Sequence, residues 1–228
     1  LETWMLVDRS PRLDFGTASC EKRDLVLGAA AGIGLLTARG GNRLGAMIMR
    51  GPRMTTVPPR QGRRNLLGIL DRVLGSPRID GAGPTDMRAG LKAVGAMAPR
   101  RGLIAVLSDF QSDPDHWRTA LGAVALRHSV LCVQVIDPRD IELPPVGLLH
   151  FVDPATGATR EVNTDDRSVR ERYAEAAARQ QAGIVRAIRS AGADHMVLRT
   201  DGDWLMDLAR HVSQRRQRAE VTAGRRVR

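Results

Sequence analysis

Apolar runs that alternate with helical patterns constrain the fold of this chain more than any other feature. Residues 4–7, 103–107 and 129–136 form such runs, which are typical of strands buried on both faces of a sheet. Helical patterns with one apolar face lie between the runs, for example at residues 21–38 and 65–74. This alternation predicts a doubly wound α/β fold, in which helices cover both faces of a mostly parallel sheet.

A β-hairpin is predicted to interrupt this alternation near residues 148–162. Two short segments flank Asp153-Pro154-Ala155-Thr156-Gly157, a sequence that favours a turn between antiparallel strands. No linker long enough to separate two domains is visible. We therefore expect one domain over residues 1–214, followed by a basic tail at 215–228 that we expect to be disordered.

A glycine-rich segment at residues 28–34 lies inside the predicted helix at 21–38. A dinucleotide-binding fingerprint needs such glycines between a strand and a helix, so this segment does not predict a nucleotide site. We expect its small residues to let the helix approach the sheet closely.

Two of the apolar runs end in aspartates, Asp8 and Asp109. Between them in the chain, Thr85 or Asp86 can cap a further helix. Because ligands of an open parallel sheet bind beyond the carboxyl ends of its strands, we expect these residues to meet at one edge. Their oxygens suit a hard divalent cation such as Mg²⁺, whereas no histidine or cysteine cluster has the spacing of a zinc site.

Five stretches of the chain together form a recognisable pattern: Leu6-Val7-Asp8-Arg9-Ser10, Gly83-Pro84-Thr85-Asp86, Leu107-Ser108-Asp109-Phe110, Asp137-Pro138-Arg139-Asp140 and Asp153-Pro154-Ala155-Thr156-Gly157. In this pattern the sequence resembles the von Willebrand factor type A fold. More narrowly, it resembles the C-terminal half of the bacterial family called domain of unknown function 58. The first three stretches are common to type A domains, and the last two point to the narrower family.

The resemblance implies a metal-ion-dependent adhesion site at the top of the sheet, in which Asp8, Ser10, Thr85 and Asp109 surround Mg²⁺. Arg12 stands where the family pattern has a further serine, so the site is degenerate at that position. In such a site, the partner protein supplies a carboxylate as the last ligand. The resemblance therefore implies that a partner is bound through an acidic group.

Arg12 leaves two alternatives open for this site. Its guanidinium can form a charge-assisted pair with Asp8 or Asp109 and so replace the cation. Alternatively, Arg12 points outward and water completes the coordination of a metal ion. In both cases Arg12, Asp86 and Ser108 are expected to contribute to partner binding. Taken singly, the aspartates could also serve only to cap helices or tie loops.

The resemblance further implies a non-enzymatic protein-interaction module. Proteins of this family often accompany MoxR-type AAA+ ATPases, so such an ATPase is the expected partner. Ser10 and Ser108 lack the glycine-flanked turn of a nucleophile, and the histidines are scattered along the chain. A hydrolase with a metal-activated water would need a general base, and none is placed beside the single metal position.

The net charge of +10 supports an alternative function, the binding of nucleic acid or another anionic surface. Arginines are concentrated at residues 60–64 and in the tail at 215–228. Such binding would depend strongly on salt, because each neutralised phosphate releases counterions. An aromatic content of 3% argues against recognition by base stacking.

Cys20 and Cys132 are too few for a disulfide framework, and we expect reduced thiols in a cytoplasmic protein. No run of about 18 apolar residues is present, so no transmembrane segment is predicted. The chain starts at Leu1, almost inside a strand, and we expect it to be a fragment whose upstream part is missing.

Overall fold

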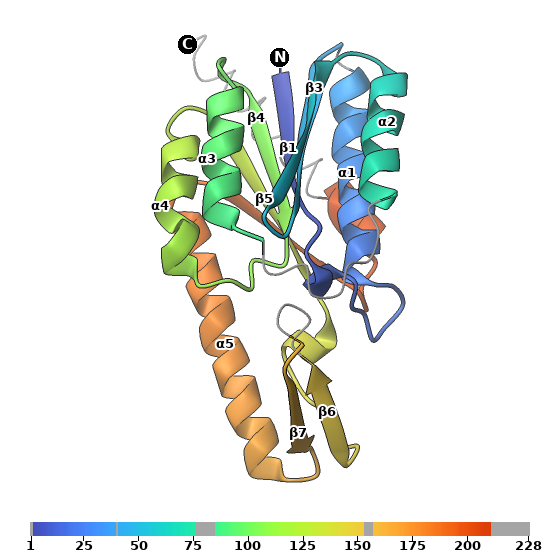
Figure 1. Cartoon of the computed structure of the whole chain (residues 1–228), viewed down its shortest axis with the longest axis vertical. Helices are drawn as coiled ribbons and strands as arrows, with labels where there is room; N and C mark the ends of the chain where they lie inside the picture. The colour runs from blue at the N-terminus through green and yellow to red at the C-terminus, as the bar shows by residue number, and fades with distance from the viewer. Residues whose placement is uncertain (1, 40, 76–84, 153–156, 211–228) are drawn as a thin grey trace.

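A six-stranded sheet forms the centre of the computed structural model, which describes residues 2–39, 41–75, 85–152 and 157–210 (Figure 1). β3 pairs antiparallel with β2 at one edge, and the other neighbours pair in parallel. The strands lie in the order β3 (Arg53–Arg60), β2 (Arg43–Arg50), β1 (Glu2–Asp8), β4 (Leu103–Ser108), β5 (Ser129–Ile136) and β8 (Asp194–Arg199).

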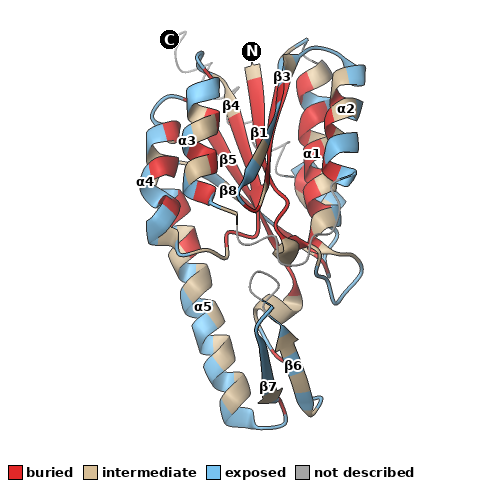
Figure 2. Cartoon of the chain, viewed as in Figure 1, coloured by how far each residue is buried: buried red, intermediate tan, exposed pale blue. Residues whose placement is uncertain are grey.

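Helices cover both faces of this sheet (Figures 1 and 2). One face carries α1 (Lys22–Arg39), α2 (Arg63–Leu74) and a helical segment at residues 204–210. The other face carries α3 (Met87–Met97), α4 (Pro114–Ala125) and α5 (Arg167–Ser190). None of the helices in the described part of the chain is both long and apolar enough to cross a membrane.

The two covered faces explain why the strand sequences are continuously apolar. Along β1, Met5 and Val7 belong to the core cluster that includes α1 and α2. Trp4 and Leu6 belong to the cluster on the other face, which includes α3, α4 and α5. All four side chains are buried, because successive residues of a strand point to opposite faces. The predicted doubly wound α/β fold is confirmed.

The predicted hairpin lies beyond the carboxyl edge of the sheet (Figure 1). β6 (Leu148–Val152) and β7 (Thr159–Asn163) pair antiparallel and form a separate two-stranded sheet. α5 follows the hairpin, and the carboxylate of Asp166 caps it by accepting a hydrogen bond from the N–H of Ser168. Most of the predicted turn at 153–157 and the predicted tail at 215–228 lie outside the described residues.

The glycines of α1 face other helices, whereas Ala29 and Ala30 of the same segment lie in the core beneath the helix. The expectation that the small residues of 28–34 face the sheet is therefore wrong for the glycines. A Cβ atom at Gly28 would lie 2.6 Å from ring atoms of Trp204, in the helical segment at 204–210. A Cβ atom at Gly34 would collide with Leu66 of α2. The residues of α1 that fill the core beneath it are Leu25, Val26, Ala29, Ala30 and Ile33.

Replacing Gly28 by alanine is expected to destabilise the protein by about 1–3 kcal/mol, because the added methyl group overlaps the ring of Trp204. The control is Gly122→Ala in α4, where an added Cβ meets nothing within 4 Å. This control is expected to gain about 0.5–1 kcal/mol, since alanine favours the helix. Urea denaturation measures both changes, and equal effects at the two positions would contradict the packing described for Gly28.

Candidate functional site

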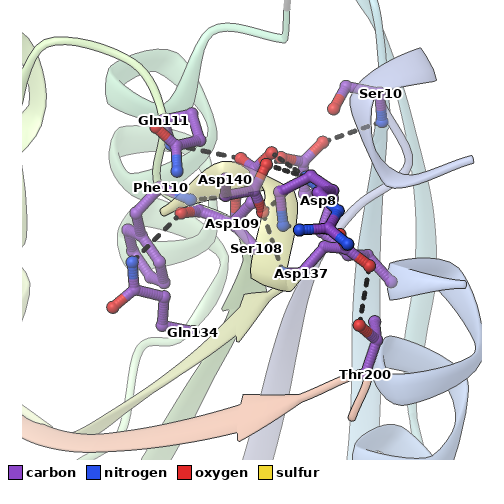
Figure 3. Close-up of polar contacts among 12 residues, drawn as sticks. Asp8, Ser10, Ser108, Asp109, Phe110, Gln111, Gln134, Asp137, Asp140 and Thr200 are labelled. Atoms are coloured by element: carbon purple, nitrogen blue, oxygen red, sulfur yellow. Dashed lines mark hydrogen bonds and ion pairs between the residues drawn. The ribbon is translucent and has the colours of Figure 1, made fainter. Parts of the chain in front are cut away.

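Two strand ends bring Asp8 and Asp109 together at the carboxyl edge of the sheet (Figure 3). β1 and β4 are parallel neighbours, and Val7 lies opposite Leu107 in their register. The residues that follow these two therefore leave the sheet side by side. Both aspartates are buried, each with 3% of its surface exposed.

Three hydrogen bonds hold the carboxylate of Asp8. The backbone N–H of Ser10 donates to its Oδ1 over 2.8 Å, and the hydroxyl of Thr85 donates to the same oxygen over 3.1 Å. The hydroxyl of Ser108 donates to Oδ2 over 2.6 Å. Burial raises the pKa of Asp8 above its usual value, and the charge of Asp109 raises it further. A cation beside the two carboxylates would stabilise their charged forms.

A small pocket of about 60 Å³ opens beside these oxygens. The four candidate metal ligands, Asp8, Ser10, Thr85 and Asp109, all line it. A pocket of this size has room for an ion or a water molecule. The structure thus brings together the residues that the sequence placed at one edge of the sheet. The remaining lining residues are Pro11, Arg12, Met87, Ser108, Gln111 and Ser112.

The donor set of this pocket suits Mg²⁺ better than a softer metal. It offers the carboxylates of Asp8 and Asp109 and the hydroxyls of Ser10, Thr85 and Ser108, all of which are oxygen ligands. Within the described ranges of the chain, no three His, Cys, Asp or Glu side chains are grouped so that they could hold a metal ion. A metal ion here would therefore depend on hydroxyl ligands as well as on the two carboxylates.

A buried lysine that the sequence did not single out supplies positive charge beside Asp109. Lys22 Nζ lies 3.4 Å from Oδ2 of Asp109 and 3.1 Å from Oδ2 of Asp140. Burial would lower the pKa of Lys22, but the two carboxylates outweigh burial and raise it. One sequence signal was present: Lys22 is the first residue of α1, where a positive charge opposes the helix dipole unless acidic partners compensate it.

Asp137, which directly follows β5, ties together three loops at the same edge (Figure 3). Thr17 donates to it from its N–H over 2.7 Å and from its hydroxyl over 2.6 Å, and the hydroxyl of Thr200 donates over 2.7 Å. Burial alone would raise the pKa of Asp137, but these bonds and one from the N–H of Arg139 lower it. Its place at the end of an apolar run could have identified it from the sequence.

Arg12 lines the pocket without pairing with its carboxylates. It belongs to a short 3-10 turn, η1 (Pro11–Leu13), that follows β1. No ion pair joins Arg12 to any carboxylate in the part of the chain that the structure describes, and Lys22 is the residue that contacts Asp109. The alternative in which Arg12 pairs with Asp8 or Asp109 is therefore not the arrangement observed.

The other two residues expected to meet a partner lie in different settings. Ser108 lines the pocket, but it is buried and its hydroxyl is bonded to Asp8. Asp86 caps α3, because its carboxylate accepts a hydrogen bond from the N–H of Ala89 over 3.0 Å. It also lies 3.2 Å from Nε2 of His116 and does not line the pocket. Asp86 thus serves as a helix cap in the structure, and its contact with a partner stays a prediction.

The Arg-rich segment at residues 60–64 lies near the amino ends of the parallel strands, whereas the pocket lies at their carboxyl ends. β3 runs antiparallel to β2, and Arg60 pairs with Leu44 near the start of β2. Residues 60–64 are all exposed. A basic surface there is separate from the pocket, and the Arg-rich tail at 215–228 falls outside the described residues.

Solved structures with the same fold define the class of this domain. The chain is similar to the SpRpn10 VWA domain, with a TM-score of 0.52 and 10% identity over 91% of this chain and 93% of that chain. It is also similar to an aerotolerance-related membrane protein from Bacteroides fragilis, with a TM-score of 0.53 and 14% identity over 83% and 99%. At these identities the likeness shows the fold, which is von Willebrand factor A-like.

The sequence places the chain more narrowly within this class. The chain belongs to the family described as "Protein of unknown function DUF58", whose model matches residues 1–183. It is 45% identical to "Uncharacterized protein Rv1480" of Mycobacterium tuberculosis over 219 residues, which make up 96% of this chain and 68% of that relative. The resemblance seen in the sequence motifs is therefore confirmed.

Proposed function

We propose that this chain is a non-enzymatic protein-interaction module whose pocket receives an acidic side chain from a partner protein. The observation that carries the proposal is the convergence of Asp8, Ser10, Thr85 and Asp109 around one pocket of about 60 Å³ at the carboxyl edge of the sheet. The von Willebrand factor A-like fold supports a protein as the partner. The pocket's place beyond the strand ends is where such sheets bind ligands.

Mg²⁺ is the proposed ion of this pocket, and the same four residues would hold it. When bound, the ion supplies a coordination position for a carboxylate oxygen. Asp8 and Asp109 provide negative charge, while the hydroxyls of Ser10 and Thr85 provide neutral oxygens. The hydrogen bonds from Thr85 and Ser108 orient the carboxylate of Asp8, so the pocket is organised before a partner arrives.

Arg12 is proposed to contact the partner's acidic group from the rim of the pocket. It lines the pocket and is half-exposed. A guanidinium can bind a carboxylate through two parallel hydrogen bonds. An arginine in place of a serine removes one ligand oxygen and adds a positive charge. We therefore expect the site to bind Mg²⁺ more weakly than it would with a serine at position 12. We also expect Arg12 to attract the partner's carboxylate more strongly than a serine would.

A MoxR-type AAA+ ATPase is the proposed partner, because the sequence resembles a family whose members often accompany such ATPases. In this role the chain would help the ATPase to select or remodel a client protein. Action in the cytoplasm is part of the same proposal, and the free thiols of Cys20 and Cys132 support it.

Binding is proposed rather than catalysis because the pocket lacks a proton-transfer group beyond its carboxylates. No histidine is among the described residues that line it. The hydroxyl of Ser108 donates to Asp8 instead of being oriented by a histidine, so no activated nucleophile is formed.

Replacing Thr85 by valine is expected to weaken Mg²⁺ binding by at least about tenfold, because valine keeps the shape of threonine but removes one ligand oxygen. Arg12→Ser adds a hydroxyl and is expected to tighten binding. Isothermal titration calorimetry with MgCl₂ measures both changes. Thr55→Val, at an exposed position of β3, is the matched control and should bind like the wild type. Absence of Mg²⁺-dependent heat in both the wild type and Arg12→Ser would remove the metal from the proposal.

A further inference from the structure

A larger groove is lined by residues of the loops at the carboxyl edge of the sheet and by residues of the β6–β7 hairpin. The hairpin lies beyond that edge (Figure 1). Its volume is about 1030 Å³, slightly above the range of about 300–1000 Å³ that is typical of small-molecule sites. Tyr173 of α5 and Phe15 of the loop after β1 also line it. The groove shares Arg12 and Asp109 with the small pocket, so the two spaces adjoin.

One wall of the groove is apolar and is built by the hairpin and the segment before it. Leu149 and Phe151 point to the same face of β6 and line this wall, together with Leu143 and Val146. Val146 is 57% exposed. A partner that covered this wall would remove apolar surface from water, which stabilises a complex.

The hairpin also offers the groove an unpaired strand edge. Among the described residues, β6 pairs only with β7. Consecutive residues of β6, from Leu149 to Val152, line the groove. Because side chains on one face of a strand alternate, a consecutive set indicates that the groove runs along the edge of β6. Extended peptides bind such edges through backbone hydrogen bonds.

Two arginines without a carboxylate partner among the described residues line the groove near the small pocket. Arg12 and Arg139 line the groove, and neither forms an ion pair within the described part of the chain. Asp14 is paired with Arg9 and Arg23, whereas Asp109 and Asp140 share Lys22. Arg12 and Arg139 are thus the guanidinium groups of the groove that have no carboxylate partner in the described ranges, and they complement an acidic side chain.

We propose that this groove binds an extended segment of a partner protein in which an acidic residue lies near an apolar one. The acidic side chain meets Arg12 and the small pocket, the backbone pairs along β6, and the apolar side chain packs against Phe151. The inference rests on the proposed function for the acidic contact. It adds an apolar residue and an extended conformation as requirements for recognition.

Libraries of short fluorescein-labelled peptides test this groove by fluorescence polarisation with the whole chain in MgCl₂. The first library has a central aspartate and one leucine or phenylalanine at varied positions. The second has serine in place of the apolar residue, and the third has asparagine in place of aspartate. We expect the first library to bind about tenfold more tightly than either of the others, because a buried apolar anchor and a charge pair each contribute at this scale.

Two variants tie this preference to the groove. Phe151→Ala and Val146→Ser are each expected to weaken binding of the first library by about tenfold and to abolish its advantage over the serine library. Val146 lies before β6 and is exposed, so its replacement leaves the pairing of the hairpin unchanged. Leu126→Ala, at an 81% exposed position after α4, is the control and should bind like the wild type.

The outcomes separate this inference from the function on which it rests. Equal binding of the first library and the serine library, with no effect of Phe151→Ala or Val146→Ser, would overturn the proposal that the groove binds an apolar residue. It would leave the proposed acidic contact intact. No binding by any library would overturn both. Binding of anionic lipid vesicles that is lost in Val146→Ser, without peptide binding, would assign the groove to a membrane surface and also overturn the inference.

Discussion

Replacing Lys22 by methionine is expected to lower the free energy of unfolding by roughly 3–5 kcal/mol. Methionine keeps an unbranched apolar stem but leaves the carboxylates of Asp109 and Asp140 without their counter-charge. The loss is large because Lys22 and Asp109 are both buried, and an uncompensated charge is costly where water cannot solvate it. Urea denaturation at neutral pH, followed by tryptophan fluorescence, measures the change.

Two further variants show whether the loss at Lys22 is electrostatic. Lys92→Met removes an exposed lysine of α3 and is expected to change stability by less than about 0.5 kcal/mol. Adding Asp140→Asn to Lys22→Met should restore part of the lost stability, because it removes one of the two uncompensated charges. If Lys22→Met were as stable as the wild type, the ammonium group would not be the counter-charge described here.

Replacing Asp137 by alanine is expected to lower the free energy of unfolding by roughly 3 kcal/mol. The change removes the acceptor of four hydrogen bonds from Thr17, Arg139 and Thr200. These donors are then left without their charged partner, at a position where Asp137 is fully buried. Urea denaturation at neutral pH measures the loss, and Asp137→Asn, which keeps the shape of the side chain, should lose less.

The pH dependence of this loss has a definite sign. The pKa of Asp137 in the folded protein lies below its unfolded value of 3.8, so its stabilisation is present above that value and is lost as the pH falls through the folded pKa. The stabilities of the wild type and Asp137→Ala should therefore converge in acid.

The control for this variant is Asp201→Ala. It removes an exposed ion pair with Arg199 and should lower the free energy of unfolding by less than about 1 kcal/mol. If Asp137→Ala lost as little stability as Asp201→Ala, the hydrogen bonds to Asp137 would not stabilise the fold as described.

Much of the fold could be predicted because local and tertiary requirements agree in this chain. Residues 130–136 are apolar except for Gln134 because β5 is covered on both faces, and the same burial makes the run visible in the sequence. The glycines at 28–34 were less informative. Their composition indicates close packing, but the packing partner is set by the path of the chain, which brings residues 204–210 and α2 against α1.

The site could be predicted only where a residue's place in the chain reveals its place at the sheet edge. Asp8 and Asp109 end apolar runs, so their convergence follows from the parallel pairing of β1 and β4. Lys22 reaches the same edge from the start of a helix, and its direction depends on how α1 packs. The groove beside the hairpin depends in the same way on where β6 lies relative to the sheet, which no local pattern encodes.

A crystal structure with bound Mn²⁺ would decide whether the pocket holds an ion. Mn²⁺ accepts the oxygen ligands that suit Mg²⁺, and its anomalous scattering locates it without ambiguity. We predict one anomalous peak among Asp8, Ser10, Thr85 and Asp109 in crystals grown with MnCl₂, and a stronger one in Arg12→Ser. A pocket without a peak in both proteins, or an ion bound only elsewhere on the chain, would contradict the proposed site.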